Sequence, residues 1–203
     1  MAGATLRVGL PDTLRDDAAA LYLDAFGAKL GPLLGRDDRA LRFLVAVMRP
    51  DLCIAAIDGD GGLLGVAGFH LDGASFIGGD VSDLRRAYGA LGALWRAPLL
   101  ALFERAPAPE EMLMDGVVVA PAARGRGIGG ALIEELAMVA RDKGFTRMRL
   151  EVVDANPRAR ALYLRRGFVT QSVRRAPYLR PLFGFGASET IVRPLAVDHE
   201  PPP

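Results

Sequence analysis

The segment Val117–Gly130 reads VVVAPAARGRGIGG, and it decides the fold because a strand leads through a glycine-rich turn directly into a helix. Glycines let a backbone approach a ligand without Cβ collisions. The first turn of the following helix leaves N–H groups unpaired and adds the positive end of the helix dipole. Arg124 and Arg126 add two full positive charges at the same place. We therefore predict that this turn binds a diphosphate or pyrophosphate group.

A second interpretation of the same loop is open at this point. Gly125, Gly127 and Gly130 also satisfy the G-x-G-x-x-G fingerprint of dinucleotide-binding folds, and Glu151 follows at a distance that suits the ribose-binding acid. The loop alone does not decide between the two. However, only 73 residues follow Gly130, which is too few for the remaining strands of a full dinucleotide-binding fold.

The elements around this loop alternate between strand and helix. Upstream, the turn Asp58–Gly62 separates two apolar runs and predicts a hairpin. Further elements are predicted from apolar spacing and caps: strands over 5–9, 112–119, 147–153, 168–174 and 188–193, and helices over 14–26, 38–48, 129–143 and 156–166. Asn156 is the predicted N-cap of the last of these helices, with Pro157 at its first position. The pattern predicts an α/β fold with a mixed central sheet of about six to seven strands flanked by helices.

The segment Asn156–Phe168 reads NPRARALYLRRGF, and with it the chain resembles the GNAT superfamily of N-acetyltransferases. One matching signature is R-x-x-G-x-G, here Arg124–Gly129, after a strand that ends in V-x-P. The other is N-x-x-A-x-x-L-Y-x-x-x-G-F, which begins 32 residues after Arg124. The close resemblance covers about residues 112–173, and the N-terminal half agrees only in the order of its elements. It implies a GNAT-type fold and an enzyme that uses acetyl-CoA.

The resemblance also implies which residues hold acetyl-CoA. The glycine-rich loop would hold the pyrophosphate, and the pantetheine arm would enter a gap between the preceding strand and the next one. The cofactor-binding residues would be Val117, Val119, Arg124, Gly125, Arg126, Gly127, Ile128, Gly129, Gly130, Asn156 and Tyr163. Gly116 lies where a bulge would start the gap, although a close packing contact would also explain a glycine there.

Tyr163 is the residue that the resemblance places at the departing sulfur. The reference pKa of tyrosine is ~10 and that of a thiol is ~8.5, so the phenol is the weaker acid. Tyr163 would therefore stabilise the thiolate by a hydrogen bond or transfer its proton fully. Family members attack directly without an acyl-enzyme, so no cysteine nucleophile is needed, and Cys53 lies in an apolar strand typical of the core.

The acceptor amine needs a proton acceptor. A lysine-like amine has a pKa of ~10.4 and is mostly protonated at neutral pH, so a base or a chain of waters should assist. Asp115 is the first candidate, because it lies on the strand beside the expected acetyl group. Glu111, Asp72 and His70 are further candidates.

Residues 73–110 form a predicted helical insertion before the cofactor-binding strand, with helices over 81–95 and 99–103 separated at Pro98. If its apolar residues were all exposed, they would form a large hydrophobic surface patch that promotes association. They are Tyr88, Leu91, Leu94, Trp95, Leu99 and Phe103. We expect them to cover an acceptor pocket with an acidic rim from Asp72, Asp80 or Asp83. Packing on the sheet edge and contact with a second subunit are the alternatives.

The composition sets the broader limits. Apolar residues make up 51% of the 203 residues, which suits one acetyltransferase domain over 1–203, with a core over about 4–176 and a tail over 194–203. Residues 1–111 carry a net charge of −4 and residues 112–203 a net charge of +5. This asymmetry is either ordinary surface charge or a C-terminal half that meets an anion and an N-terminal half that tolerates a cation. The sequence has no apolar run of ~18 residues and no secretory signal, and its single cysteine excludes an internal disulfide.

From these limits we expect a cytoplasmic protein with no metal, nucleic-acid or membrane partner. A homodimer is allowed by the apolar residues of the insertion. The alternative to an acetyltransferase is a non-catalytic CoA-binding or protein-interaction module on the same fold.

Overall fold

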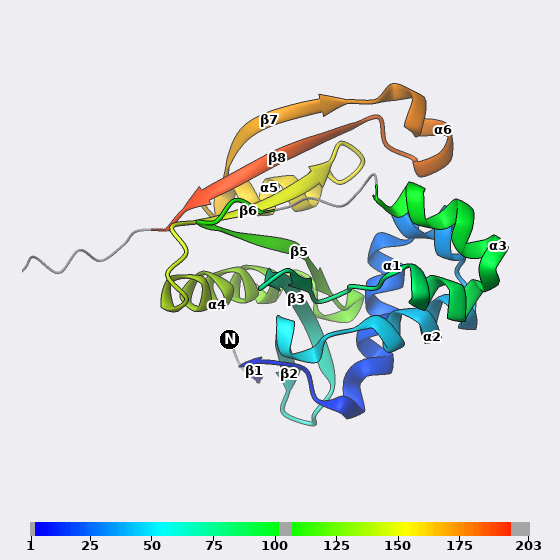
Figure 1. Ribbon diagram of the computed structural model, residues 1–203. Coiled ribbons are helices and arrows are strands. Elements are labelled where there is room, and N and C mark those ends of the chain that lie inside the picture. Colours follow the sequence, from blue (N-terminus) through cyan, green and yellow to red (C-terminus); the bar gives the residue numbers. More distant parts are fainter. Residues whose placement is uncertain (1–2, 102–106, 196–203) are drawn as a thin grey trace, which may run out of the picture.

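The computed structural model describes residues 3–101 and 107–195, which form one sheet with helices on both faces (Figure 1). The strands are β1 (Ala4–Val8), β2 (Cys53–Asp58), β3 (Leu63–Leu71), β4 (Ala74–Ser75), β5 (Glu111–Val119), β6 (Arg147–Val153), β7 (Val169–Arg175) and β8 (Ala187–Pro194). The helices are α1 (Arg15–Leu34), α2 (Asp38–Val47), α3 (Val81–Ala101), α4 (Ile128–Asp142), α5 (Pro157–Arg165) and α6 (Arg180–Phe183).

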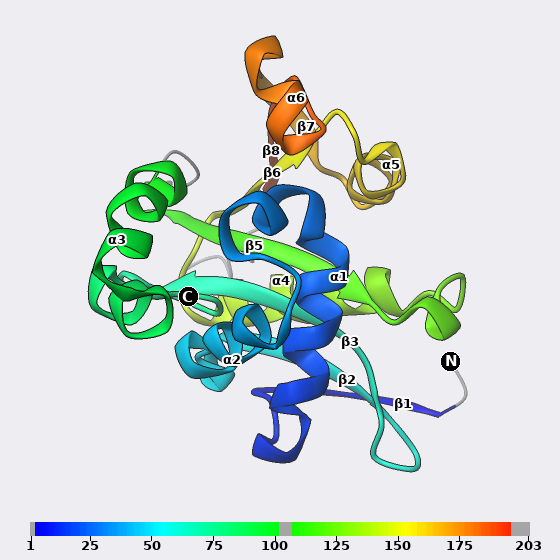
Figure 2. The same ribbon diagram turned by 90° about the vertical axis from the view of Figure 1, so that its right-hand side faces the viewer.

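The strands follow the order β1-β2-β3-β5-β6-β8-β7, and β4 pairs with β3 outside this path. The pairing of β5 with β6 is parallel and the other pairings are antiparallel. Figure 2 shows α1 in front of β3 and β5, with α4 on the opposite face of the sheet. The predicted α/β fold with a mixed sheet is confirmed, with eight strands instead of six to seven.

Local sequence explains the N-terminal half of the sheet. The Asp58 carboxylate accepts hydrogen bonds from the backbone N–H of Asp60 (3.0 Å) and of Gly62 (2.7 Å), which closes the predicted β2–β3 hairpin. The Asp37 carboxylate accepts from the Ala40 N–H at 3.1 Å and caps α2. α1 continues eight residues beyond its predicted end, through Pro32 to Leu34. These capped and buried elements form the layer that supports the site.

The insertion differs from its prediction in three ways. A turn at Asp72 and Gly73 returns the chain as β4, a strand that the prediction lacks. The helical segment α3 bends at Gly89 (φ 73°) and not at Pro98, which lies within its second half. The insertion lies against α1 and α2, where the Tyr88 hydroxyl donates to the Leu34 carbonyl at 2.8 Å. Phe103 lies outside the described residues.

The C-terminal part of the sheet extends beyond the predicted core boundary at residue 176. β8 lies between β6 and β7 and pairs with both, so it is an internal strand. The connection from β7 to β8 contains the short helix α6, which lies against α1. Most of the predicted tail, residues 196–203, lies outside the described residues, but Leu195 is buried. None of the helices in the described ranges has the length and apolarity needed to cross a membrane.

Candidate functional site

The glycine-rich loop connects the end of β5 to the start of α4 through a single 3-10 turn, Pro121–Ala123. Gly125 (φ 80°) and Gly127 (φ 82°) have left-handed backbones that favour glycine, and no atom lies within 4 Å of a Cβ added at either position. Gly127 is the N-cap of α4, so the unpaired N–H groups of the first helical turn lie at the loop. The loop therefore has open space, free N–H groups and the helix dipole, as an anionic group requires.

Arginines surround this loop. Arg124 and Arg126 are exposed, and the Arg124 Nε–H donates to the Val119 carbonyl at 3.1 Å. Arg166, at the end of α5, lies so close to Gly130 that any side chain there would overlap its guanidinium. Arg166 also pairs with Glu134 at 3.6 Å. The sequence motifs do not indicate this third arginine, because its position depends on how α5 packs against the start of α4.

The gap expected between two strands is present next to the loop. β5 and β6 pair only from Glu111 to Leu113 on β5, opposite residues 147–149, and then diverge (Figure 1). Beyond Leu113, β5 keeps its pairing with β3. No further pairing of β5 with β6 occurs among the described residues. On this stretch of β5 the Val119 carbonyl accepts from Arg124, and a backbone group of Val117 hydrogen-bonds Tyr163.

The predicted bulge is confirmed at the start of this gap. Gly68 pairs with Gly116, whereas Phe69 pairs with Met114, so Asp115 is the extra residue on β5. Gly116 has φ 145°, and a Cβ at this position would lie 2.6 Å from the Phe26 ring of α1. Both explanations considered for Gly116 hold, since it is a bulge residue and a close packing contact.

Tyr163 reaches this gap from α5. Its side chain is only 4% exposed and packs on Phe168 with ring centroids 5.5 Å apart. Burial raises the pKa of Tyr163 to about 12, and a backbone hydrogen bond of Val117 opposes the rise. The phenol therefore stays protonated at neutral pH and can donate a hydrogen bond to an anion in the gap. Asn156 is the predicted N-cap, accepting from the Ala159 N–H at 3.1 Å, but its side chain is exposed.

On the α1 side of the gap, Asp115 contacts His70. The His70 Nε2 lies 2.5 Å from Asp115 Oδ1, and the Phe76 N–H donates to Asp115 Oδ2 at 3.0 Å. Tyr22 of α1 is buried nearby, and its pKa is raised well above the usual value by burial, then by the negative charge of Asp115, and last by its electrostatic interaction with Tyr163. Asp115, Tyr22 and Tyr163 thus share one neighbourhood, in which sequence analysis had not placed Tyr22.

The other carboxylates predicted as candidate bases or as the acidic rim of an acceptor pocket have different positions or partners. The buried Glu111 forms ion pairs with Arg147 (2.8 Å) and Arg149 (3.1 Å), so it is a structural carboxylate. Asp72 is at an exposed turn with φ 51°. Asp80 accepts from the Ser82 hydroxyl at 2.6 Å, and Asp83 pairs with Arg86 at 2.8 Å. Within the described residues, His, Cys, Asp and Glu side chains do not gather in threes as a metal site would require.

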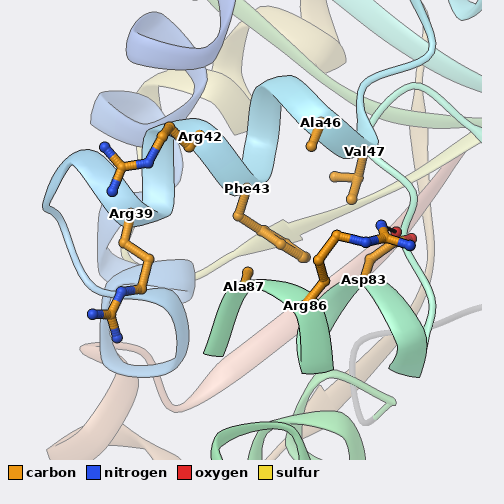
Figure 3. A pocket seen from close by; sticks show the side chains of 8 residues that line it. All are labelled: Arg39, Arg42, Phe43, Ala46, Val47, Asp83, Arg86 and Ala87. Atoms are coloured by element: carbon orange, nitrogen blue, oxygen red, sulfur yellow. Dashed lines mark hydrogen bonds and ion pairs between the residues drawn. The ribbon is translucent and has the colours of Figure 1, made fainter. Parts of the chain in front are cut away.

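The expected acceptor pocket beneath the insertion is not formed by its central apolar residues. Leu91 and Leu94 are 82% and 74% exposed, and Trp95 is half exposed with the Arg96 guanidinium 4.1 Å from its ring. A cavity of about 280 Å³ does lie between α2 and α3 (Figure 3). Its lining includes Phe43 and Val47 as well as the Arg86–Asp83 pair, and none of the residues around the gap belongs to it.

Comparison with known proteins identifies the family. The Acetyltransferase (GNAT) family profile matches residues 15–168. The thialysine N-epsilon-acetyltransferase of Bos taurus is 46% identical over 50 residues, which is 25% of this chain and 29% of the cattle protein. The corresponding Sus scrofa protein is 44% identical over the same shares. This chain therefore matches less than a third of the length of these relatives.

Solved structures share the fold over nearly the whole chain. A GCN5-related N-acetyltransferase from Kribbella flavida has a TM-score of 0.62 at 19% identity, covering 95% of this chain and 98% of that one. A phosphinothricin acetyltransferase from Sinorhizobium meliloti, solved in complex with AcCoA, has a TM-score of 0.58 at 20% identity, covering 99% of this chain and 93% of that one. With the profile match over most of its length, the chain belongs to the GNAT family of acetyltransferases.

Proposed function

We propose that this protein transfers the acetyl group of acetyl-CoA to the primary amine of a small molecule or peptide by direct attack, without an acyl-enzyme. The observation that carries the proposal is the opening between β5 and β6 beyond Leu113. It has the glycine-rich loop at one end, and the Tyr163 hydroxyl and the His70–Asp115 pair lie beside it. These groups would serve the phosphates, the thioester and the amine, respectively.

The loop residues fit the diphosphate of CoA. Free N–H groups at the start of α4 and the exposed Arg124 and Arg126 would hold its charge, and the open space at Gly125 and Gly127 would admit it. Arg166 would add a third cation beside Gly130. The edge of β5 at Val117 and Val119, which β6 does not pair, would bond the pantetheine arm in the manner of a neighbouring strand.

The reacting groups would meet beyond this arm. Acetyl-CoA supplies an activated thioester whose carbonyl carbon the amine nitrogen attacks. The C–N bond forms, the C–S bond breaks, and the electron pair leaves with the sulfur. Tyr163 would donate its hydrogen bond to that sulfur, which its raised pKa supports, since the phenol keeps its proton. The His70–Asp115 pair would serve the amine.

Two experiments test this function. Acetyl-CoA should raise the melting temperature of the protein, as a ligand of the native state must. Mixing the protein with acetyl-CoA and an amine panel should release CoA thiol, which a thiol reagent measures. Thialysine, lysine, phosphinothricin and polyamines are the first acceptors, since relatives carry two of these names. Cys53 is buried, so it adds little to the signal. Binding without thiol release for any amine would favour a non-catalytic CoA-binding module.

The position of the diphosphate has its own test. Arg124→Ala combined with Arg126→Ala should weaken acetyl-CoA binding at least tenfold, because charge-assisted hydrogen bonds contribute about 1.5–3 kcal/mol each. Calorimetric titration measures the change. Arg158→Ala is the matched control, since Arg158 is an exposed arginine of α5 outside the loop. If the double variant binds like this control, the diphosphate lies elsewhere.

A further inference from the structure

In the contact between His70 and Asp115, the carboxylate is more fully engaged and less exposed than the imidazole. Both oxygens of the Asp115 carboxylate are engaged, Oδ1 with His70 Nε2 at 2.5 Å and Oδ2 with the Phe76 N–H at 3.0 Å. The side chain is also only 11% exposed. A carboxylate held in this way is poorly placed to take a proton from a substrate. It is well placed to orient a histidine.

The bulge on β5 creates this arrangement. Side chains of a regular strand alternate between the two faces of a sheet, so Asp115 would lie on the face opposite to Gly116. The Gly116 position faces Phe26 of α1, yet Asp115 also contacts Phe76 and His70. A Cβ at Gly68, two residues before His70, would also meet Phe76. The extra residue therefore turns Asp115 onto the α1 face, where it meets His70.

The hydrogen bond fixes which ring nitrogen of His70 carries a proton. An ionised carboxylate only accepts, so Nε2 must donate to Asp115 and the lone pair of the neutral ring lies on Nδ1. Among the described residues, Nδ1 has no hydrogen-bond partner. The His70 side chain is 24% exposed, so the pair has an open side at the histidine. The free lone pair thus belongs to the more accessible member of the pair.

We propose that His70 is the base that accepts the proton of the acceptor amine, and that Asp115 is a positioning residue that holds its ring. The inference rests on the proposed acetyltransferase function. The ammonium gives one proton to His70 Nδ1, which passes it to solvent. The neutral nitrogen then attacks, and the proton that it sheds on forming the amide ends on the CoA sulfur beside Tyr163. The products are the amide, CoA as a thiol and one proton in solvent.

The surrounding charges suit this role. Asp115 from β5 and Tyr163 from α5 act on Tyr22 of α1, Asp72 lies two residues after His70 at an exposed turn, and β4 contributes no titratable side chain. Burial raises the pKa of Tyr22 and of Tyr163, so both phenols are neutral at neutral pH. Asp115 is then the anion that contacts His70, and its charge stabilises the imidazolium that forms.

The decisive variant is His70→Gln, whose amide can still donate to Asp115 but has no basic nitrogen. We expect turnover to fall roughly a hundred- to ten-thousandfold, the usual effect of one acid–base group. The melting temperature and acetyl-CoA affinity should stay close to those of the parent. Ser75→Ala, beside His70 in the β3–β4 pairing, is the control for local disturbance.

The tautomer of the His70 ring tests whether Asp115 positions it. The chain has only two histidines, so nitrogen NMR in a His199→Ala background reports on His70 alone. We expect one neutral tautomer, with the proton on Nε2, and a mixture of tautomers in Asp115→Asn together with reduced turnover. Imidazole added to His70→Ala should restore part of the activity.

The outcomes separate the two proposals. A parent protein that acetylates no amine contradicts the proposed function, whereas the NMR result still tests the pair. If the parent is active and His70→Gln keeps its turnover, the proposed acetyltransferase function holds, but the base is a group other than His70. If the melting temperature and the cofactor affinity of His70→Gln fall together with its turnover, the pair is a structural link between β3 and β5. This result would overturn the inference.

Discussion

Single residues decide the chemistry of this site, and Tyr163 is the clearest case. Its hydroxyl is buried at the gap, while its ring packs on Phe168. Tyr163→Phe keeps this packing and removes only the donor. We expect turnover to fall roughly ten- to a thousandfold with little change in acetyl-CoA affinity. Steady-state kinetics and a binding titration measure the two effects, and an unchanged turnover would mean that water or another group serves the sulfur.

The same residue should leave a mark on alkaline stability. The pKa of Tyr163 is about 12 in the folded protein and ~10 when unfolded, so the folded state holds this proton more tightly. Its contribution, about 3 kcal/mol, is fully present below pH ~10 and is lost as the pH rises through about 12. Urea unfolding at pH 8 and at higher pH should therefore show a smaller alkaline loss in Tyr163→Phe. Cys53 titrates in the same direction in both proteins and cancels in the difference, and the burial that is the largest cause of the raised Tyr22 pKa is common to both.

At the scale of elements, the bulge in β5 connects backbone geometry to the site. Gly116 has φ 145° and lies against the Phe26 ring, so Gly116→Ala should destabilise the fold by about 2–3 kcal/mol. The methyl group should also displace the bulge and move Asp115 away from His70, which should reduce turnover. Gly59→Ala is the matched control, because Gly59 lies in the β2–β3 turn with no atom within 4 Å of an added Cβ. Equal urea midpoints for the two variants would contradict the role given to Gly116.

Among the helices, strands and turns, the sequence predicts those that depend on local signals. The β2–β3 hairpin, the cap of α5 and the loop before α4 depend on short-range signals, and these predictions are confirmed. The bend of α3 at Gly89 was not anticipated, because Pro98 was the stronger local signal and glycine is only a permissive one. The insertion of β8 between β6 and β7 depends on pairing between distant strands, which local patterns do not encode.

In the candidate site too, local motifs indicate some features, whereas others depend on contacts between distant residues. Two motifs located the loop and Tyr163, and the glycine in a strand indicated the bulge. The contact of His70 with Asp115 joins residues 45 positions apart and requires the register of β3 on β5 together with the bulge. Arg166 meets Gly130 only through the packing of α5 on α4. Neither contact has a periodicity or motif that would reveal it.

For the whole molecule, the sheet consists of two parts joined by a short parallel pairing. The β1-β2-β3-β5 part carries α1, α2 and α4, and the β6-β8-β7 part carries α5 and α6 (Figure 1). The gap opens where these parts diverge, so the proposed cofactor would contact both. The second half of the chain, which carries the net charge of +5, supplies Arg124, Arg126 and Arg166. The charge asymmetry of the sequence thus coincides with the proposed phosphate side of the site.

The last prediction concerns association of whole molecules. Leu91 and Leu94 are the most exposed large apolar residues of α3, and Trp95 follows them on the same helix. The buried side of α3 is already used, since Leu84 and Ala93 are buried and Tyr88 and Arg96 bind the end of α1. Packing on α1 and α2 therefore cannot explain the exposed residues. An apolar group of this kind suits contact with a second subunit.

We expect the protein to be a dimer at micromolar concentration, and Leu91→Glu combined with Leu94→Glu to produce monomers. The charges would have to be buried without partners at the interface, which costs several kcal/mol, whereas in a monomer they remain in water. Light scattering after gel filtration measures the mass. Val169→Glu is the control, because Val169 is an exposed apolar residue of β7. Because the exposed residues lie outside the gap, the monomeric variant should keep its acetyl-CoA affinity. A parent that is monomeric at all concentrations would refute the interface, and a raised acceptor KM in the double variant would instead place this face of α3 beside the acceptor.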